Sequence, residues 1–263
     1  MKKEIEYSEV IDKLEIFSKW FLFKLTEKIS LKKELYLRNS LAKNISLLKS
    51  IDILRKQGSY NEGWILYRSL VERLVYIYYL TENDCFDLFD DWSFIKKYEY
   101  RNNARADEKF KNILVDPNFK VKPEEPKKYK ILKENNIKWD KPDPFIILKS
   151  KGLDFIYKFG YDFASTHTHP LISDGEYEFL SMTGLEPNPY IAINQDYLIN
   201  NSIVITTLIH QEVFNILDFK FSSLAYSFLG EVNKLINNEP NACDEVFYKL
   251  LKMAEEGRSW FEK

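Results

Sequence analysis

The placement of proline is the feature that most constrains how this chain can fold. The 263 residues contain no proline before Pro117 and none between Pro189 and Pro240. Proline breaks helix interiors, so its absence leaves two long stretches in which helices can run without interruption. Apolar residues recur at helical spacing in these stretches and near the C-terminus, and we expect helices over 4–30, 33–57, 61–82, 151–169, 194–218, 220–238 and 242–262. The sequence therefore predicts an all-α protein.

Glycine is scarce, which excludes one class of ligand site. The chain has 8 glycines, well below the average of roughly 7% of residues. None of them falls in a GxGxxG or GxxxxGK pattern, the loops that bind phosphate through backbone amides. A Rossmann or P-loop nucleotide site is excluded, and any site must be built from side chains on packed helices.

The middle of the chain differs in character from the two ends. The stretch PNFKVKPEEPKKYK, residues 117–130, is charged, contains prolines and is poor in core residues, whereas YEYRNNARADEKFKN just before it is compatible with a helix. We expect one helical domain over 1–263, with N-terminal helices in 1–82, a charged insertion or flap over 83–150, and C-terminal helices in 151–263. This is a single bundle of six to seven helices with a long irregular insertion between core helices.

Charge and cysteine content limit the setting. There are 38 basic and 40 acidic residues, a net charge of −2, which excludes a broad positive field for coating nucleic acid. Cys85 and Cys243 have no CxxC spacing and are typical of buried or free thiols in a reducing compartment. Neither an apolar leader nor an uninterrupted apolar segment of membrane-spanning length is present. We expect a cytoplasmic protein without a membrane partner.

The most apolar helix, 61–82, carries two charges on one side. Arg68 and Glu72 are four residues apart and lie within about 40° of each other around the helix axis. An unpaired charge on an apolar face is heavily penalised, so these side chains either form an internal ion pair or serve a pocket. Arg73 points elsewhere.

The second candidate cluster is YDFASTHTHP, residues 161–170. Asp162, Ser165 and His169 share one helical face, and Pro170 places His169 at or just past the end of the helix. An imidazole beside a hydroxyl and a carboxylate is suited to acid–base catalysis. The alternative is a buried helix-stop histidine that bonds a backbone carbonyl. His167 lies on a different face, where we expect it to be exposed.

The remaining patterns argue against a metal centre and against a serine nucleophile. His210 and Glu212 are two residues apart and face differently, and His210 is expected to face the core with a polar partner. No HExxH pattern supports a metal site, and the Ser165–His169 pair lacks the GxSxG context of hydrolases. We therefore expect neither a metal nor a cofactor.

The residues from Leu35 to Thr81, and the second cluster, resemble a bacterial family known as domain of unknown function 5677. In that family an Arg-Ser-Leu-x-Glu helix is followed much later by Tyr-x-x-x-Ser-x-x-x-His-Pro. Here the first motif is Arg68 to Glu72, and the second is Tyr161, Ser165, His169 and Pro170. The resemblance covers about residues 35–215 and implies an all-helical bundle.

Such bundles are more loosely similar to the higher-eukaryote-and-prokaryote nucleotide-binding (HEPN) domains, many of which are metal-independent ribonucleases of defence or toxin systems. Those nucleases carry an arginine four to six residues before the catalytic histidine, whereas here the nearest upstream Lys or Arg is Lys158. The resemblance implies a ribonuclease or nucleotide-binding protein of bacterial antiviral defence, acting on RNA or a nucleotide.

Two hypotheses follow for the four candidate residues. In the first they form a pocket in which His169 is the general acid/base, Arg68 stabilises phosphate charge, Glu72 orients one of them and Ser165 lies beside them. In the second the protein is a non-catalytic interaction protein, with a protein partner or as a homo-oligomer, and the polar cluster is a structural latch between helices.

Overall fold

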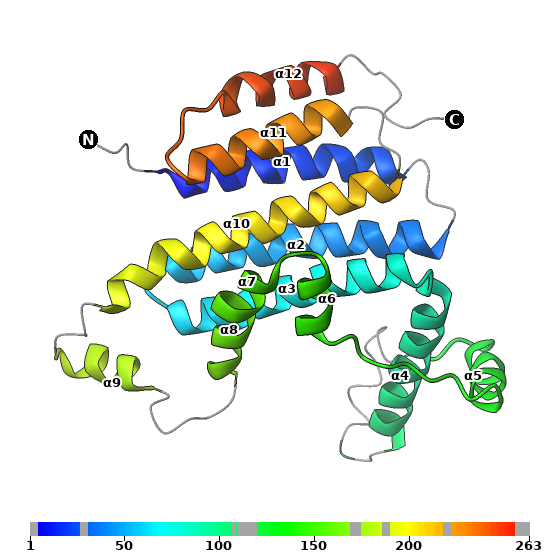
Figure 1. Ribbon diagram of the computed structural model, residues 1–263. Coiled ribbons are helices and arrows are strands. Elements are labelled where there is room, and N and C mark those ends of the chain that lie inside the picture. Colours follow the sequence, from blue (N-terminus) through cyan, green and yellow to red (C-terminus); the bar gives the residue numbers. More distant parts are fainter. Residues whose placement is uncertain are drawn as a thin grey trace. The chain divides into compact units, whose positions relative to one another are not determined.

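The computed structural model describes residues 5–26, 31–106, 109, 120–168, 175–185, 190–217 and 222–255. Every regular element in these ranges is helical (Figure 1). The predicted all-α class is confirmed.

Six long helices form the main body of the protein. The bounds of five of them agree with the predicted helices to within four residues: α1 Tyr7–Thr26, α2 Lys32–Lys56, α3 Tyr60–Glu82, α10 Tyr190–Leu217 and α11 Ser222–Ile236. The sixth, α12 Cys243–Glu255, starts one residue after its predicted start, and the rest of the predicted range 242–262 lies outside the described residues. Helix α2 packs against α1 and α10, α11 packs against α10 and α12, and α12 returns to α1 (Figure 1). The first and last thirds of the chain therefore share one core.

The core is built from the apolar stripes that predicted the helices. In α2 the residues at helical spacing, Leu37, Leu41, Leu48 and Ile51, are all fully buried. Burying a side chain of this size contributes about 1.5–3 kcal/mol each. Packing against neighbouring helices, more than intrinsic helix propensity, stabilises these segments.

Shorter helices lie between α3 and α10 in the sequence, in a less regular part of the chain. They are α6 Pro144–Ser150, α7 Asp154–Ile156, the π-helical turn η3 Tyr157–Tyr161, α8 Asp162–Thr166 and α9 Glu176–Thr183. Helix α6 has a clear N-cap, because the Asp143 carboxylate accepts hydrogen bonds from the amides of Phe145 and Ile146 at 2.8 and 3.2 Å. The predicted helix over 151–169 is thus divided by a π-helical turn, a feature often found at functional sites.

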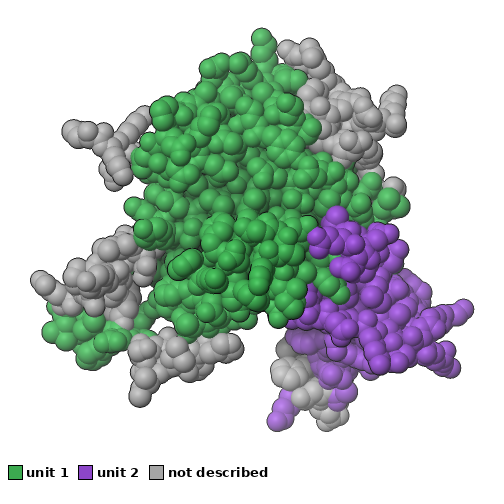
Figure 2. All heavy atoms as spheres, in the orientation of Figure 1, with its two compact units in different colours: residues 1–79, 143–263 green, residues 80–142 purple. Residues whose placement is uncertain are grey.

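The chain divides into two compact units (Figure 2). Unit 1 comprises residues 1–79 and 143–263, and unit 2 comprises residues 80–142. Unit 2 holds α4 Phe86–Ala106 and α5 Glu125–Glu134, which pack against each other. Unit 2 covers most of the insertion expected over 83–150, and it contains two helices.

Unit 2 has its own side-chain contacts, which explain this helical content. The Arg101 guanidinium pairs with Glu125 at 2.9 Å, and Tyr98 stacks on Tyr129 with ring centres 4.5 Å apart. Aromatic rings of Phe89, Trp92 and Trp139 form a second cluster. These contacts join α4 to residues far along the chain, information that local periodicity does not contain.

Candidate functional site

The two predicted clusters meet at one place in unit 1. Helix α3 contributes Arg68 and Glu72, η3 contributes Tyr161, and Thr168 follows the end of α8. We call these four residues the polar cluster. Their side chains join segments that are about 100 residues apart in the sequence.

Arg68 is the centre of the polar cluster. Its Nη1 donates a hydrogen bond to Thr168 Oγ1 at 2.6 Å, and its Nε lies 3.6 Å from Glu72 Oε1. The guanidinium carbon also lies over the Tyr161 ring, 5.0 Å from the ring centre, a distance typical of a cation–π contact. The Arg68 side chain is 23% exposed, so these interactions are only partly screened by water.

Tyr161 closes the cluster from the opposite segment. Its hydroxyl donates to Glu72 Oε1 at 3.0 Å, and the residue is buried. Burial, together with the negative charge of Glu72, raises the pKa of the Tyr161 hydroxyl, which stays a donor at neutral pH. Glu72 Oε1 thus accepts the hydrogen bond from the Tyr161 hydroxyl and also faces the Arg68 guanidinium.

Ser165 supports the cluster through the backbone. Its hydroxyl donates to the Tyr161 carbonyl at 2.7 Å, one turn earlier in the same segment. Its own carbonyl accepts a hydrogen bond from Thr168 Oγ1 at 2.8 Å. The Thr168 hydroxyl therefore accepts from Arg68 and donates to Ser165, so Ser165 positions a residue that Arg68 touches.

His169 and Pro170, which the sequence placed at the centre of the site, lie outside the described residues. Of the four predicted site residues, Arg68 and Glu72 face each other, and Ser165 is linked to them through Tyr161 and through Thr168, the residue immediately before His169. His167 is half-buried rather than exposed, because its ring packs edge-on against Phe163 at 5.0 Å.

His210 has the environment expected from the sequence. It is fully buried between α1 and α10, with Nδ1 at 2.7 Å from the Thr206 carbonyl and Nε2 at 2.7 Å from Ser18 Oγ. Burial lowers the pKa of His210 to about 4, so the ring is neutral at pH 7. A core-facing histidine with a polar partner is confirmed.

The described residues also bear on metal binding and on membrane insertion. No group of three or more His, Cys, Asp or Glu side chains in these ranges could hold a metal ion. None of the helices in the same ranges combines the length and apolarity needed to cross a membrane.

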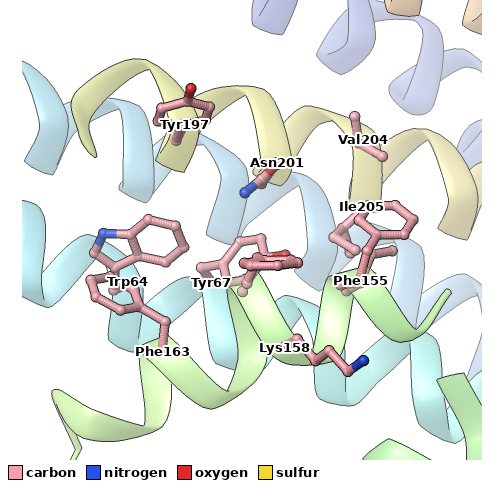
Figure 3. A pocket seen from close by; sticks show the side chains of 12 residues that line it. Trp64, Tyr67, Phe155, Lys158, Phe163, Tyr197, Asn201, Val204 and Ile205 are labelled. Atoms are coloured by element: carbon pink, nitrogen blue, oxygen red, sulfur yellow. The ribbon is translucent and has the colours of Figure 1, made fainter. Parts of the chain in front are cut away.

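A pocket of about 460 Å³ lies in the same part of unit 1 (Figure 3). Helix α3, the 154–166 segment and α10 line it, and half of the residues that line it are aromatic. This pocket was not predicted from the sequence, although a signal was present: Phe155, Phe159 and Phe163 recur every four residues. Neither was Thr168 predicted, for which no pattern gave a signal, nor Tyr161, which the resemblance motif contained.

The fold and the site define an all-helical protein in which a polar cluster fixes a short, π-bulged segment onto a central helix, next to an aromatic pocket. This chain belongs to the family of unknown function DUF5677, whose family model matches residues 34–184, more than half of its length. The matched region contains the polar cluster. No curated protein and no solved structure matches the chain.

Proposed function

We propose that the chain is a non-catalytic helical interaction protein in which the polar cluster is a structural latch. The observation that supports this proposal is that the cluster's groups bind one another: Arg68 donates to Thr168 and Tyr161 donates to Glu72. The latch fastens the 154–168 segment to α3, and this segment also lines the aromatic pocket. The surface that it orders is the one offered to a partner, a protein or a second copy of the chain. The two free thiols support a reducing compartment, and we propose the cytoplasm.

The latch is tested by removing single hydrogen-bonding groups. Tyr161→Phe deletes one hydroxyl without changing the ring, and we expect the free energy of unfolding to fall by about 1–2 kcal/mol, because the lost bond ends on a charged acceptor. Tyr248→Phe is the matched control, since Tyr248 is 65% exposed on α12 and should stay within about 0.5 kcal/mol of wild type. Urea unfolding followed by circular dichroism gives both values.

A double-mutant cycle tests whether the cluster acts as a unit. Arg68 touches the Tyr161 ring while Tyr161 binds Glu72, so Arg68→Ala and Tyr161→Phe should be non-additive, with a coupling of about 0.5–3 kcal/mol. If both single variants unfold at the wild-type denaturant concentration, the latch is excluded.

A second candidate, a metal-independent ribonuclease or nucleotide-binding protein of a bacterial defence system, is favoured by one contact. Arg68 holds Thr168, which directly precedes His169 in the sequence. In this candidate His169 acts as general acid/base, Arg68 stabilises the charge of the phosphate and the RNA 2′-hydroxyl is the nucleophile, so that no protein nucleophile is needed.

The two candidates are separated by one assay on folded protein. RNA degradation is measured in EDTA for wild type, His169→Ala and Arg68→Ala, together with Tyr248→Phe as a control. Degradation by wild type and the control, lost in the two variants, would support the ribonuclease. Absence of degradation by well-folded wild type, or equal degradation by all four proteins, would remove it.

A further inference from the structure

The aromatic pocket has a floor that is fully buried and a rim that is exposed. Trp64 and Tyr67 of α3 form the floor, with 3% and 1% of their surfaces exposed. At the rim, Phe159 is 74% exposed and Tyr197 is 58% exposed. Exposed apolar residues on a protein surface are usually scattered singly. A group of exposed rings around a concave, apolar floor is therefore typical of a binding site.

The shape of the pocket depends on a close approach between two elements. A Cβ added to Gly160 would lie 2.5 Å from the Tyr67 hydroxyl oxygen, so only glycine allows η3 to pack this closely on α3. The floor rings are also fixed, because Trp64 contacts Tyr67 and Phe163 edge-to-face at 5.2 and 5.0 Å. The walls are therefore held in place by packing in the described structure.

One polar group of the wall points inward. Figure 3 shows the Asn201 amide on the side of α10 that faces the rings, while the Lys158 ammonium extends away from them. Lys158 also lies 3.6 Å from Asp154, which offsets its charge. The lining thus combines aromatic rings, two of which are tyrosines, with the Asn201 amide, which offers both a donor and an acceptor.

This combination selects a chemical class of ligand. Ring faces favour a flat aromatic molecule, which stacks on them or meets their edges. A side-chain amide pairs bidentately with a heteroaromatic edge that carries a donor next to an acceptor. The volume of about 460 Å³ lies within the range of small-molecule sites, roughly 300–1,000 Å³.

We infer that the pocket binds a flat heteroaromatic ring with a hydrogen-bond donor and acceptor side by side on one edge, the chemistry of a nucleobase. The Asn201 amide forms hydrogen bonds with this edge of the ligand, and the rings of Phe159 and Phe163 stack on the faces of the ligand. The inference can be tested separately from the latch and from RNA cleavage, because none of the residues that line the pocket belongs to the polar cluster.

The test uses 2-aminopurine, whose fluorescence is quenched when it stacks, titrated into the full chain and checked by calorimetry. Indole, which is flat but lacks the paired edge, is the comparison ligand. For so small a ligand we expect a dissociation constant of roughly 0.1–1 mM, and indole should bind at least about tenfold more weakly.

Three variants locate the binding. Asn201→Leu keeps the size of the side chain and should weaken 2-aminopurine at least about tenfold without weakening indole. Phe159→Ala should weaken 2-aminopurine about fivefold or more through lost stacking. Phe23→Ala, which removes a ring that is 62% exposed on α1, should leave both affinities unchanged. All variants are first shown to melt like wild type.

The outcomes decide the inference. Selective 2-aminopurine binding that Asn201→Leu abolishes supports it. If indole and 2-aminopurine bind with equal affinity, and Asn201→Leu changes neither affinity, the inference is wrong. The pocket is then an apolar groove for protein side chains. No binding up to 5 mM (about five times the weakest constant expected) also overturns the inference. Adenosine and a short oligoadenylate, used as competitors, distinguish a free heterocycle from a base within a strand.

Discussion

The buried histidine makes the stability of this protein depend on pH in a defined way. At neutral pH the His210 Nδ1–H donates to the Thr206 carbonyl, because a carbonyl can only accept, and Nε2 lies 2.7 Å from Oγ of Ser18, whose hydroxyl donates to the Leu14 carbonyl at 2.6 Å. The other close contacts of the ring are to Phe17 and Phe214. None of these neighbours carries a charge that could stabilise an imidazolium.

The magnitude follows from the pKa of the buried ring. Burial lowers the pKa of His210 from 6.5 to about 4, which corresponds to about 3 kcal/mol of differential stability. Because the pKa is lower in the folded state, this contribution is fully present above pH 6.5 and is lost as the pH falls toward 4. From linkage we expect wild type to lose about 0.8 kcal/mol by pH 6 and about 2 kcal/mol by pH 5.

The assay is urea unfolding at pH 8, 6 and 5, comparing wild type with His210→Asn. This window avoids the carboxylates of Glu15 and Asp52, whose lowered pKa values place their titration at more acidic pH. The variant is less stable at pH 8, but its free energy of unfolding should change far less between pH 8 and 5. Phe228→Leu, a core substitution without a titratable group, should keep the wild-type pH dependence. If His210→Asn loses as much stability as wild type over this window, the burial argument is refuted.

Three further expectations can be checked with the same protein. Gly160→Ala should lower the free energy of unfolding by about 1–3 kcal/mol, because the added methyl group collides with the buried tyrosine of α3. Gly230→Ala, which has open space around it inside α11, should raise it by about 0.5–1 kcal/mol. If thermal unfolding ranks the two variants in the opposite order, this packing argument is wrong. Asp143→Ala removes two N-cap hydrogen bonds from α6 and should cost about 1 kcal/mol in urea unfolding, so an unchanged midpoint would mean that the cap contributes nothing. Cys243 is buried with its pKa raised to about 11, so Ellman's reagent at pH 8 should label the half-buried Cys85 first, and equal rates in folded protein would contradict this burial.

Local pattern predicted the helices well and their partners poorly. The apolar stripes gave α1, α2, α3 and α10 to within a few residues, because each helix must bury one face. The four-residue spacing also placed Arg68 and Glu72 together. Periodicity says nothing about which segment packs opposite, so the Arg68–Thr168 contact could not be predicted.

The π-helical turn is a second limit of sequence reasoning. A regular helix over 151–169 would relate every face of this segment by 100° per residue. The turn over Tyr157–Tyr161 changes that count between the residues before it and those after it, whereas Asp162, Ser165 and His169 all follow the turn. Gly160 was the visible sign of this irregularity, but its role depends on Tyr67, which is distant in the sequence.

The packing of α2 against α10 also has a consequence during synthesis of the chain. Helix α2 ends at Lys56 and α10 ends at Leu217, so about 160 residues separate the completion of one helix from the other. At about 5–20 residues per second, the ribosome needs roughly 8–30 s to make this stretch. For that time α2, whose Leu37, Leu41 and Leu48 are fully buried in the finished protein, has α1 but not α10 to pack against. A nascent chain of this kind is a natural client for a chaperone that shields apolar helix faces until translation has passed α10.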